Sequence, residues 1–170
     1  KRLEQLDFKG VDSLDKIKLI IQNKLKEVKP NEWILGFGWD QNLFADKLFP
    51  LSVFLDEISP NNPIYFTRID GHSAWVNKTA LLKTNKSINQ INDLDGGKVI
   101  NDCILIDNSM SVFKNILPSE NKDQVKKWIL NAANKACSYG ITGVHDAWQD
   151  SIVIESIKEL IEEGRFPIRC

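Results

Sequence analysis

The residues best suited to chemistry lie around one predicted turn. Residues 64–69 are β-branched and aromatic, follow a proline, and are predicted to form a strand. The turn after them carries Asp70 and His72, and Ser73 is predicted to cap a helix that follows. Such a strand, turn and helix would direct the side chains of Arg68, Asp70 and His72 toward the opening of one pocket, where we expect a ligand to bind. The alternative is a plain turn, in which Asp70 accepts backbone N–H groups.

A second candidate pair, His145 and Asp146, comes at the end of a short apolar segment at residues 141–145. If this segment is a parallel strand of an α/β sheet, the pair lies at its carboxyl end, where such folds place ligands. The alternative is that His145 bonds to a neighbouring loop and Asp146 caps the next segment. The pocket that Asp70 and His72 would face is expected to have an apolar wall formed by Trp75 or Trp39. Trp39 ends a predicted strand with two glycines.

A self-contained metal centre is not predicted. Catalytic zinc takes about three protein ligands from His, Asp or Glu. The chain has two histidines, far apart and outside any His-x-His or His-Glu-x-x-His pattern. Its three cysteines are odd in number and widely spaced, which disfavours a disulfide framework and a cysteine metal site. The sequence also lacks the Gly-x-Ser-x-Gly pattern of acyl transfer and the Gly-x-Gly-x-x-Gly pattern of phosphate loops.

Composition narrows the classes of partner. The 170 residues are 42% hydrophobic and include five Trp and eight Phe, which suffices for one packed domain with an added lobe. The formal net charge is -1 and no Lys/Arg cluster is present, so nucleic-acid binding is not expected. No apolar run approaches a membrane span and residues 1–10 do not resemble a signal peptide, so we expect no membrane partner and a cytoplasmic location. A homo-oligomer stays open.

The predicted helices and strands fall into two parts that differ in the order of these elements. Residues 1–118 are expected to form an α+β subdomain. Residues 119–170 read as helix, strand, helix and strand with short connections, which implies parallel pairing. In this second part Ser119 is predicted to cap a helix that Gly140 closes, and Gly164 closes the next helix. The first part is predicted to contain helices at 13–29 and 51–58, loops at 41–50 and 83–98, a strand at 33–40 and a strand pair at 99–106.

Four ordered motifs carry a family resemblance. They are WILGFGWD from residue 33, LDEISPNNPIYFTRIDGHSAWVNKTALL from residue 55, CILIDNSM from residue 103 and GITGVHDA from residue 140. In this order they resemble the amidohydrolase-3 family of metal-dependent hydrolases, which includes N-substituted formamide deformylases. The third motif departs from the family pattern, because residues 101–103 read Asn-Asp-Cys where Thr-Gly is usual. The likeness spans almost the whole chain.

The resemblance implies an α/β fold with part of a (β/α) barrel. Residues 1–118 would be an α+β subdomain inserted between barrel strands 1 and 2, and residues 119–170 would hold the second strand and the start of the third. In the full-length protein a divalent metal, zinc by expectation, would be bound by residues outside this chain, and none is expected within it. The predicted rhythm agrees, because it ends on an uncovered parallel strand and so predicts a piece of a larger α/β protein.

The reaction that the resemblance implies is hydrolysis of an amide-like or cyclic C–N bond in a small-molecule substrate. The residues that would line the substrate side of its pocket are Trp39, Asp70, His72 and His145. Weaker candidates are Arg68, Asp107 and Asp146. We expect the chain by itself to be inactive. Two alternatives remain open: a stand-alone small-ligand-binding or regulatory module derived from the enzyme, and a purely structural fragment.

Overall fold

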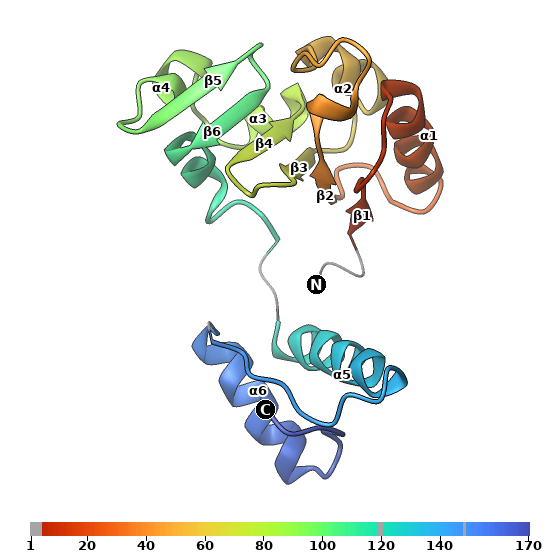
Figure 1. The fold of residues 1–170 in the computed structure, drawn as a ribbon. Coiled ribbons are helices and arrows are strands. Elements are labelled where there is room, and N and C mark those ends of the chain that lie inside the picture. Colours follow the sequence, from red (N-terminus) through yellow and green to blue (C-terminus); the bar gives the residue numbers. More distant parts are fainter. Residues whose placement is uncertain (1–4, 119–120, 148) are drawn as a thin grey trace. The chain divides into compact units, whose positions relative to one another are not determined.

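The computed structural model describes residues 5–118, 121–147 and 149–170, which divide into two compact units. The first unit ends at Pro118. Figure 1 shows it as a sheet flanked by helices, and shows the second unit as two helices with extended segments between and after them. Ser119, the predicted cap of the following helix, lies outside the described residues. In the structure, Asn121 is the N-cap of that helix.

A six-stranded mixed sheet forms the centre of the first unit, in the order β1-β2-β3-β4-β6-β5. The first three strands are parallel, and the pairs β3–β4, β4–β6 and β5–β6 are antiparallel. The bounds are β1 (Leu6–Asp7), β2 (Ile34–Trp39), β3 (Ile64–Arg68), β4 (Ser73–Val76), β5 (Gly97–Ile100) and β6 (Ile104–Asp107). Because the direction changes at β3/β4, the carboxyl ends of β2, β3 and β6 and the amino end of β4 share one edge.

Short helices connect the strands of this unit. Their bounds are α1 (Leu14–Leu25), η2 (Gln41–Leu43), α2 (Ser52–Ile58), α3 (Lys78–Leu82), α4 (Ile88–Asn92) and η3 (Asn108–Phe113), of which η2 and η3 are 3-10 helices. Ser13 caps α1 as predicted, because its side chain accepts the backbone N–H of Lys16 at 3.4 Å. The helix ends at Leu25, before Pro30, so the predicted range of 13–29 is too long.

Two segments differ from the sequence-based expectations. The helix predicted from Ser73 to near Leu82 is helical only in its second half, because its first residues form strand β4, which pairs with both β3 and β6. Two ladders of backbone hydrogen bonds outweigh the weak helical preference of four residues, and helix α3 begins only after its cap, Asn77. The predicted loop at 83–98 contains helix α4, whose capping box joins Ser87 and Gln90. The strand pair around 99–106 is confirmed as β5 and β6, with Asn101 and Asp102 in the left-handed region between them.

Both faces of the sheet are buried. On one face α1 and α2 pack on a cluster that includes Phe66 and Trp75. On the other face α3, α4 and η3 pack on a cluster that includes Tyr65 and Phe113. Alternate residues of β3 thus serve opposite faces, as strand geometry requires. The candidate site therefore lies at the end of a sheet that is anchored on both sides.

The second unit consists of α5 (Lys122–Ser138) and α6 (Ser151–Glu162) with the segments that follow them. Gly140 and Gly164 close these helices at φ 76° and 65°, as predicted. The two strands predicted for this part of the chain, at 141–145 and after the second helix, are reduced to one parallel bridge between Gly143 and Arg169. The mixed α/β class is confirmed by the sheet of the first unit. Among the described helices, none combines the length and apolar character that crossing a membrane demands.

An ion ladder joins the two helices of this unit. Lys122 Nζ lies 2.5 Å from Glu159 Oε1 and 3.2 Å from Glu155 Oε2. Lys126 Nζ lies 2.7 Å from both Glu159 Oε2 and Glu163 Oε1. The hydrogen bonds from Lys122 and Lys126 lower the pKa of Glu159 to about 2. The ladder therefore favours one register of α5 against α6.

Candidate functional site

Arg68 is the centre of a polar network at the carboxyl ends of β2 and β3. Its Nε donates to Gln41 Oε1 at 2.8 Å, and its Nη2 donates to Asp40 Oδ1 at 3.1 Å. Its Nη1 donates to the carboxylate of Asp70. The side chain is only 15% exposed, and two carboxylates compensate its charge. Arg68 therefore ties the segment after β2 to the turn after β3.

The turn between β3 and β4 fixes the main chain at His72. Asp70 Oδ1 accepts the backbone N–H of His72 at 3.0 Å, while its other oxygen is held by Arg68. Gly71 adopts φ 79°, which a tight turn of this kind needs, and its N–H donates to the carbonyl of Arg68 at 3.0 Å. The hydrogen bonds of Asp70 are therefore those of a turn residue that positions its neighbour.

His72 and Asp107 form a side-chain pair across two strands. The register of β4 and β6 pairs Ser73 with Ile106, so His72 and Asp107 are opposite each other at the end of the ladder. His72 Nδ1 lies 2.9 Å from Asp107 Oδ1. The two side chains are 75% and 51% exposed. This pair is the most exposed part of the network.

Trp39 lies beneath this edge, in the core. It is fully buried, and its Nε1 donates to the carbonyl of Phe66 at 2.9 Å. Its ring packs against that of Trp75, which is also fully buried, with ring centroids 5.7 Å apart. Neither ring reaches the surface of this unit. Trp39 therefore supports the ends of β2 and β3 from inside.

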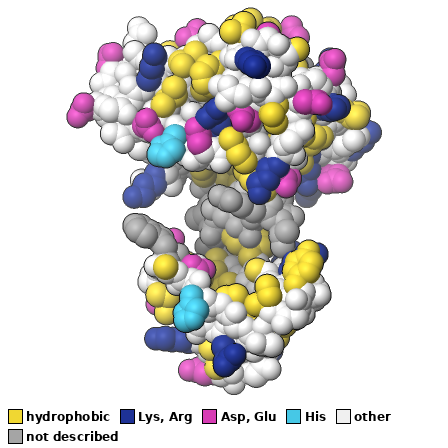
Figure 2. Space-filling model, in the orientation of Figure 1, with side chains coloured by type: hydrophobic (Ala, Val, Ile, Leu, Met, Phe, Trp, Pro, Cys, Tyr) yellow, Lys and Arg dark blue, Asp and Glu magenta, His cyan; other side chains and the backbone are white. Residues whose placement is uncertain are grey.

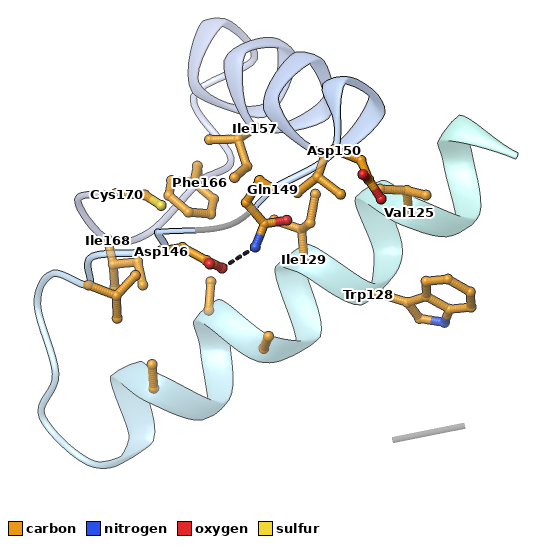
Figure 3. A pocket seen from close by; sticks show the side chains of 15 residues that line it. Val125, Trp128, Ile129, Asp146, Gln149, Asp150, Ile157, Phe166, Ile168 and Cys170 are labelled. Carbon is orange, nitrogen blue, oxygen red and sulfur yellow. Dashed lines mark hydrogen bonds between the residues drawn. The ribbon is translucent and has the colours of Figure 1, made fainter. Parts of the chain in front are cut away.

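His145 and Asp146 lie in the second unit, in the segment between its helices. His145 is exposed. Asp146 accepts a hydrogen bond from Gln149, and both line a groove of about 460 Å³. Figure 3 shows this groove and the Asp146–Gln149 bond within it. The apolar side chains of its lining include Val125, Ile129, Ile157, Phe166 and Ile168. This surface has the composition of a helix-packing face with a polar end.

The residues described do not by themselves fit a metal centre. Within 5–118, 121–147 and 149–170, no three His, Cys, Asp or Glu side chains gather in a way that could hold an ion. At the sheet edge, Asp40 and Asp70 are turned to Arg68, while His72 and Asp107 pair with each other. A catalytic zinc site takes about three protein ligands. Among the described residues, this edge is a network of hydrogen bonds and ion pairs.

The thiol of Cys103 is a core group. It is fully buried, and burial raises its pKa to about 12. Such a thiol stays protonated near neutral pH and is a poor nucleophile.

The surface of the first unit carries charges of both signs. Figure 2 shows acidic and basic side chains interspersed on its visible face. This face therefore has mixed charge.

Asp40 and Gln41, which hold Arg68, were not among the predicted site residues, although Asp40 ends the WILGFGWD motif. Asp40 also accepts the backbone N–H of Asn42 at 3.0 Å, which caps helix η2. When two strands are known to be neighbours, an acid at the end of one and an arginine at the end of the other predict an ion pair. The parallel pairing of β2 and β3 supplies that knowledge.

Comparison with known proteins identifies a family. A family model described as "Amidohydrolase family" matches residues 2–170. The putative amidohydrolase YtcJ of Bacillus subtilis (strain 168) is 28% identical over 178 residues, which cover 98% of this chain and 33% of that protein. Protein LONG AFTER FAR-RED 3 of Arabidopsis thaliana is 29% identical over 151 residues, which cover 85% of this chain and 26% of that protein. An uncharacterized metal-dependent hydrolase from Pyrococcus horikoshii OT3 has a similar fold, with a TM-score of 0.63 and 20% identity over 98% of this chain and 32% of that one.

The matches cover a much larger share of this chain than of its relatives. They cover most of this chain, whereas the chain spans about a quarter to a third of the length of the curated relatives. The family model runs through both units, so the sheet edge and the groove lie within the matched region. The resemblance expected from the four motifs is thereby confirmed. This chain belongs to the amidohydrolase family.

Proposed function

We propose that this chain is part of a metal-dependent amidohydrolase that hydrolyses an amide-like C–N bond of a small-molecule substrate. The observation that carries the proposal is the family match over residues 2–170. The name of the relative YtcJ, a putative amidohydrolase, supports amide chemistry. The exposed His72–Asp107 pair adds support, because polar side chains held at the end of a sheet suit contact with a polar substrate.

The metal, zinc in this proposal, would be bound by residues outside this chain. The described residues do not gather the about three ligands that catalytic zinc takes. Because the chain spans about a third of YtcJ, a protein of that length has further sequence to supply them. It follows that the 170-residue chain alone would have no hydrolase activity.

The architecture we propose for the whole protein is a (β/α) barrel. Residues 119–170 would contribute the second strand and the start of the third, and residues 1–118 would be a subdomain inserted between strands 1 and 2. The parallel bridge between Gly143 and Arg169, next to α5 and α6, supports this placement. Further barrel elements would then cover the apolar groove of the second unit.

Within that architecture some candidate residues would contact the substrate, and others would hold those residues in place. His72 would be a polar contact to substrate, and Arg68 and Asp70 would hold its main chain through the turn. Trp39 would support the same edge from the core. His145 and Asp146 would belong to the pocket at the carboxyl end of the second barrel strand.

The test uses the full-length protein with formamides, N-acyl amines and cyclic amides as substrates. We expect turnover that is lost on chelation and restored by zinc, and none from the 170-residue chain alone. His72→Ala should lower kcat/KM about tenfold or more, the loss of about 1.4 kcal/mol of transition-state stabilisation. Lys18→Ala, at an exposed position of α1, is the control and should leave kcat/KM unchanged.

Three results would contradict the proposal in different ways. Unchanged kcat/KM in His72→Ala would remove His72 from the substrate pocket. Zinc-dependent turnover by the 170-residue chain would show that its own residues complete a metal centre. Absence of turnover by the full-length protein on all three amide classes would reject C–N hydrolysis as the reaction.

A further inference from the structure

The His72–Asp107 pair fixes which imidazole nitrogen carries the proton. Asp107 Oδ1 lies 2.9 Å from His72 Nδ1, and an ionised carboxylate only accepts hydrogen bonds. The neutral imidazole that satisfies this contact has its proton on Nδ1 and a lone pair on Nε2. A histidine side chain free in water favours the opposite tautomer. The pair therefore shifts an equilibrium that spectroscopy measures.

Main-chain contacts hold both partners in register. The backbone N–H of Asp107 donates to the carbonyl of His72 at 3.0 Å, and the backbone N–H of His72 donates to Asp70 Oδ1 at 3.0 Å. The carboxylate and the imidazole are thus attached to backbone positions that are already paired. For the 2.9 Å contact between them, only the side-chain torsions of the two residues remain to be ordered.

The backbone conformation at position 107 suits glycine better than aspartate, so the presence of an aspartate there calls for an explanation. It adopts φ 48° and ψ -117°, a conformation that residues with a side chain rarely adopt and that glycine adopts freely. An aspartate at this position carries an energetic cost that a glycine would avoid. The contact with His72 is the interaction that the aspartate adds there.

We propose that Asp107 is a positioning residue that holds His72 as the Nδ1–H tautomer, so that Nε2 accepts a hydrogen bond from an N–H group of the substrate. The imidazole is 75% exposed, so a small molecule reaches it. An amide or the amine released from it is the donor class that fits a ring nitrogen with a lone pair. The substrate class rests on the proposed function, whereas the tautomer is measured without any substrate.

The experiment is a long-range ¹H–¹⁵N NMR spectrum of the ¹⁵N-labelled 170-residue chain, recorded at a pH where imidazole is neutral. The chain has two histidines, so the His145→Gln variant assigns the signals of the His72 ring. We expect a protonated Nδ1 and an unprotonated Nε2 at His72. Asp107→Gly removes the carboxylate and accepts the backbone conformation, and it should lower the ratio of Nδ1–H to Nε2–H tautomer about fivefold or more.

The hairpin supplies a matched control. Asp102 is also an aspartate at positive φ, 56°, in the turn between β5 and β6, so Asp102→Gly should leave the tautomer ratio at its wild-type value. A wild-type spectrum dominated by the Nε2–H form of His72 overturns the proposal, whether or not any variant folds. An unchanged ratio in Asp107→Gly also overturns it. The kinetics of His72→Ala test the substrate contact separately, so failure of one proposal is distinguishable from failure of the other.

Discussion

Replacing Asn77 by alanine should destabilise the first unit more than an ordinary loss of a helix cap. The side chain is fully buried, and its Oδ1 accepts the backbone N–H groups of Ile64 at 2.9 Å and Ala80 at 3.0 Å. Its Nδ2 donates to the carbonyls of Ser59 at 2.8 Å and Asn62 at 2.9 Å. One amide thus joins the end of α2, the start of β3 and the start of α3.

The magnitude follows from the backbone groups left without these partners. Alanine would strand the N–H groups of Ile64 and Ala80 and the carbonyl of Ser59, all in buried residues. The carbonyl of Asn62 keeps a hydrogen bond from Ser59 Oγ at 3.1 Å. At about 1–3 kcal/mol for each stranded group, the loss is about 3–6 kcal/mol once partial relaxation is allowed. Such a loss is a large part of the about 5–15 kcal/mol that stabilises a typical domain.

The assay is urea unfolding followed by tryptophan fluorescence, which reports on the buried rings of Trp39 and Trp75 in the same unit. The control is Ser87→Ala, which removes the exposed N-cap of α4 and should cost about 1 kcal/mol. If Asn77→Ala lowers the free energy of unfolding no more than Ser87→Ala does, the account of stranded buried groups is wrong.

Three further predictions concern packing, pH and thiol chemistry. Gly36→Ala should lower the free energy of unfolding by about 1–3 kcal/mol in the same assay, because its Cβ would lie 2.8 Å from Phe66 Cδ1; an unchanged value would mean that the core yields freely. Hydrogen bonds from Lys122 and Lys126 lower the pKa of Glu159 from its ordinary 4.5 to about 2 in the folded state. This carboxylate therefore contributes stability above pH 4.5 that is lost as the pH falls toward 2, and thermal unfolding at stepped pH should show a smaller decline in Glu159→Gln. A thiol reagent should modify the two exposed cysteines of the native chain rapidly and Cys103 only after denaturation, because burial raises the Cys103 pKa to about 12; equal rates for all three would refute this.

Local signals in the sequence were sufficient for much of the fold. The apolar run after Pro63 predicts β3, the serine cap predicts the start of α1, and two glycines predict the ends of α5 and α6. The helix expected from Ser73 to near Leu82 begins too early, because residues 73–76 pair with strands on both sides, and pairing is a tertiary effect that short propensities do not reveal. Its second half is helical, as α3. Helix α4 was within reach, since Ser87 and Gln90 form a capping box that is visible in the sequence.

The candidate site was predictable only in part. Arg68, Asp70 and His72 are close in sequence, and the structure brings them together through one turn. The contact of His72 with Asp107 depends on the register of β4 against β6, across 35 positions, and no local pattern fixes that register. The burial of Trp39 depends equally on packing between distant segments.

The polar edge of the sheet has a consequence for how the protein folds. Arg68 meets Gln41 across 27 positions, and His72 meets Asp107 across 35. Closing loops of this length costs conformational entropy, so we expect these contacts to form together with the docking of β2, β3, β4 and β6 and not before it. With the tautomer proposed above, the proton of the His72 ring would move from Nε2 to Nδ1 when β6 docks during refolding. The tautomer ratio of His72 would therefore report when the sheet is complete.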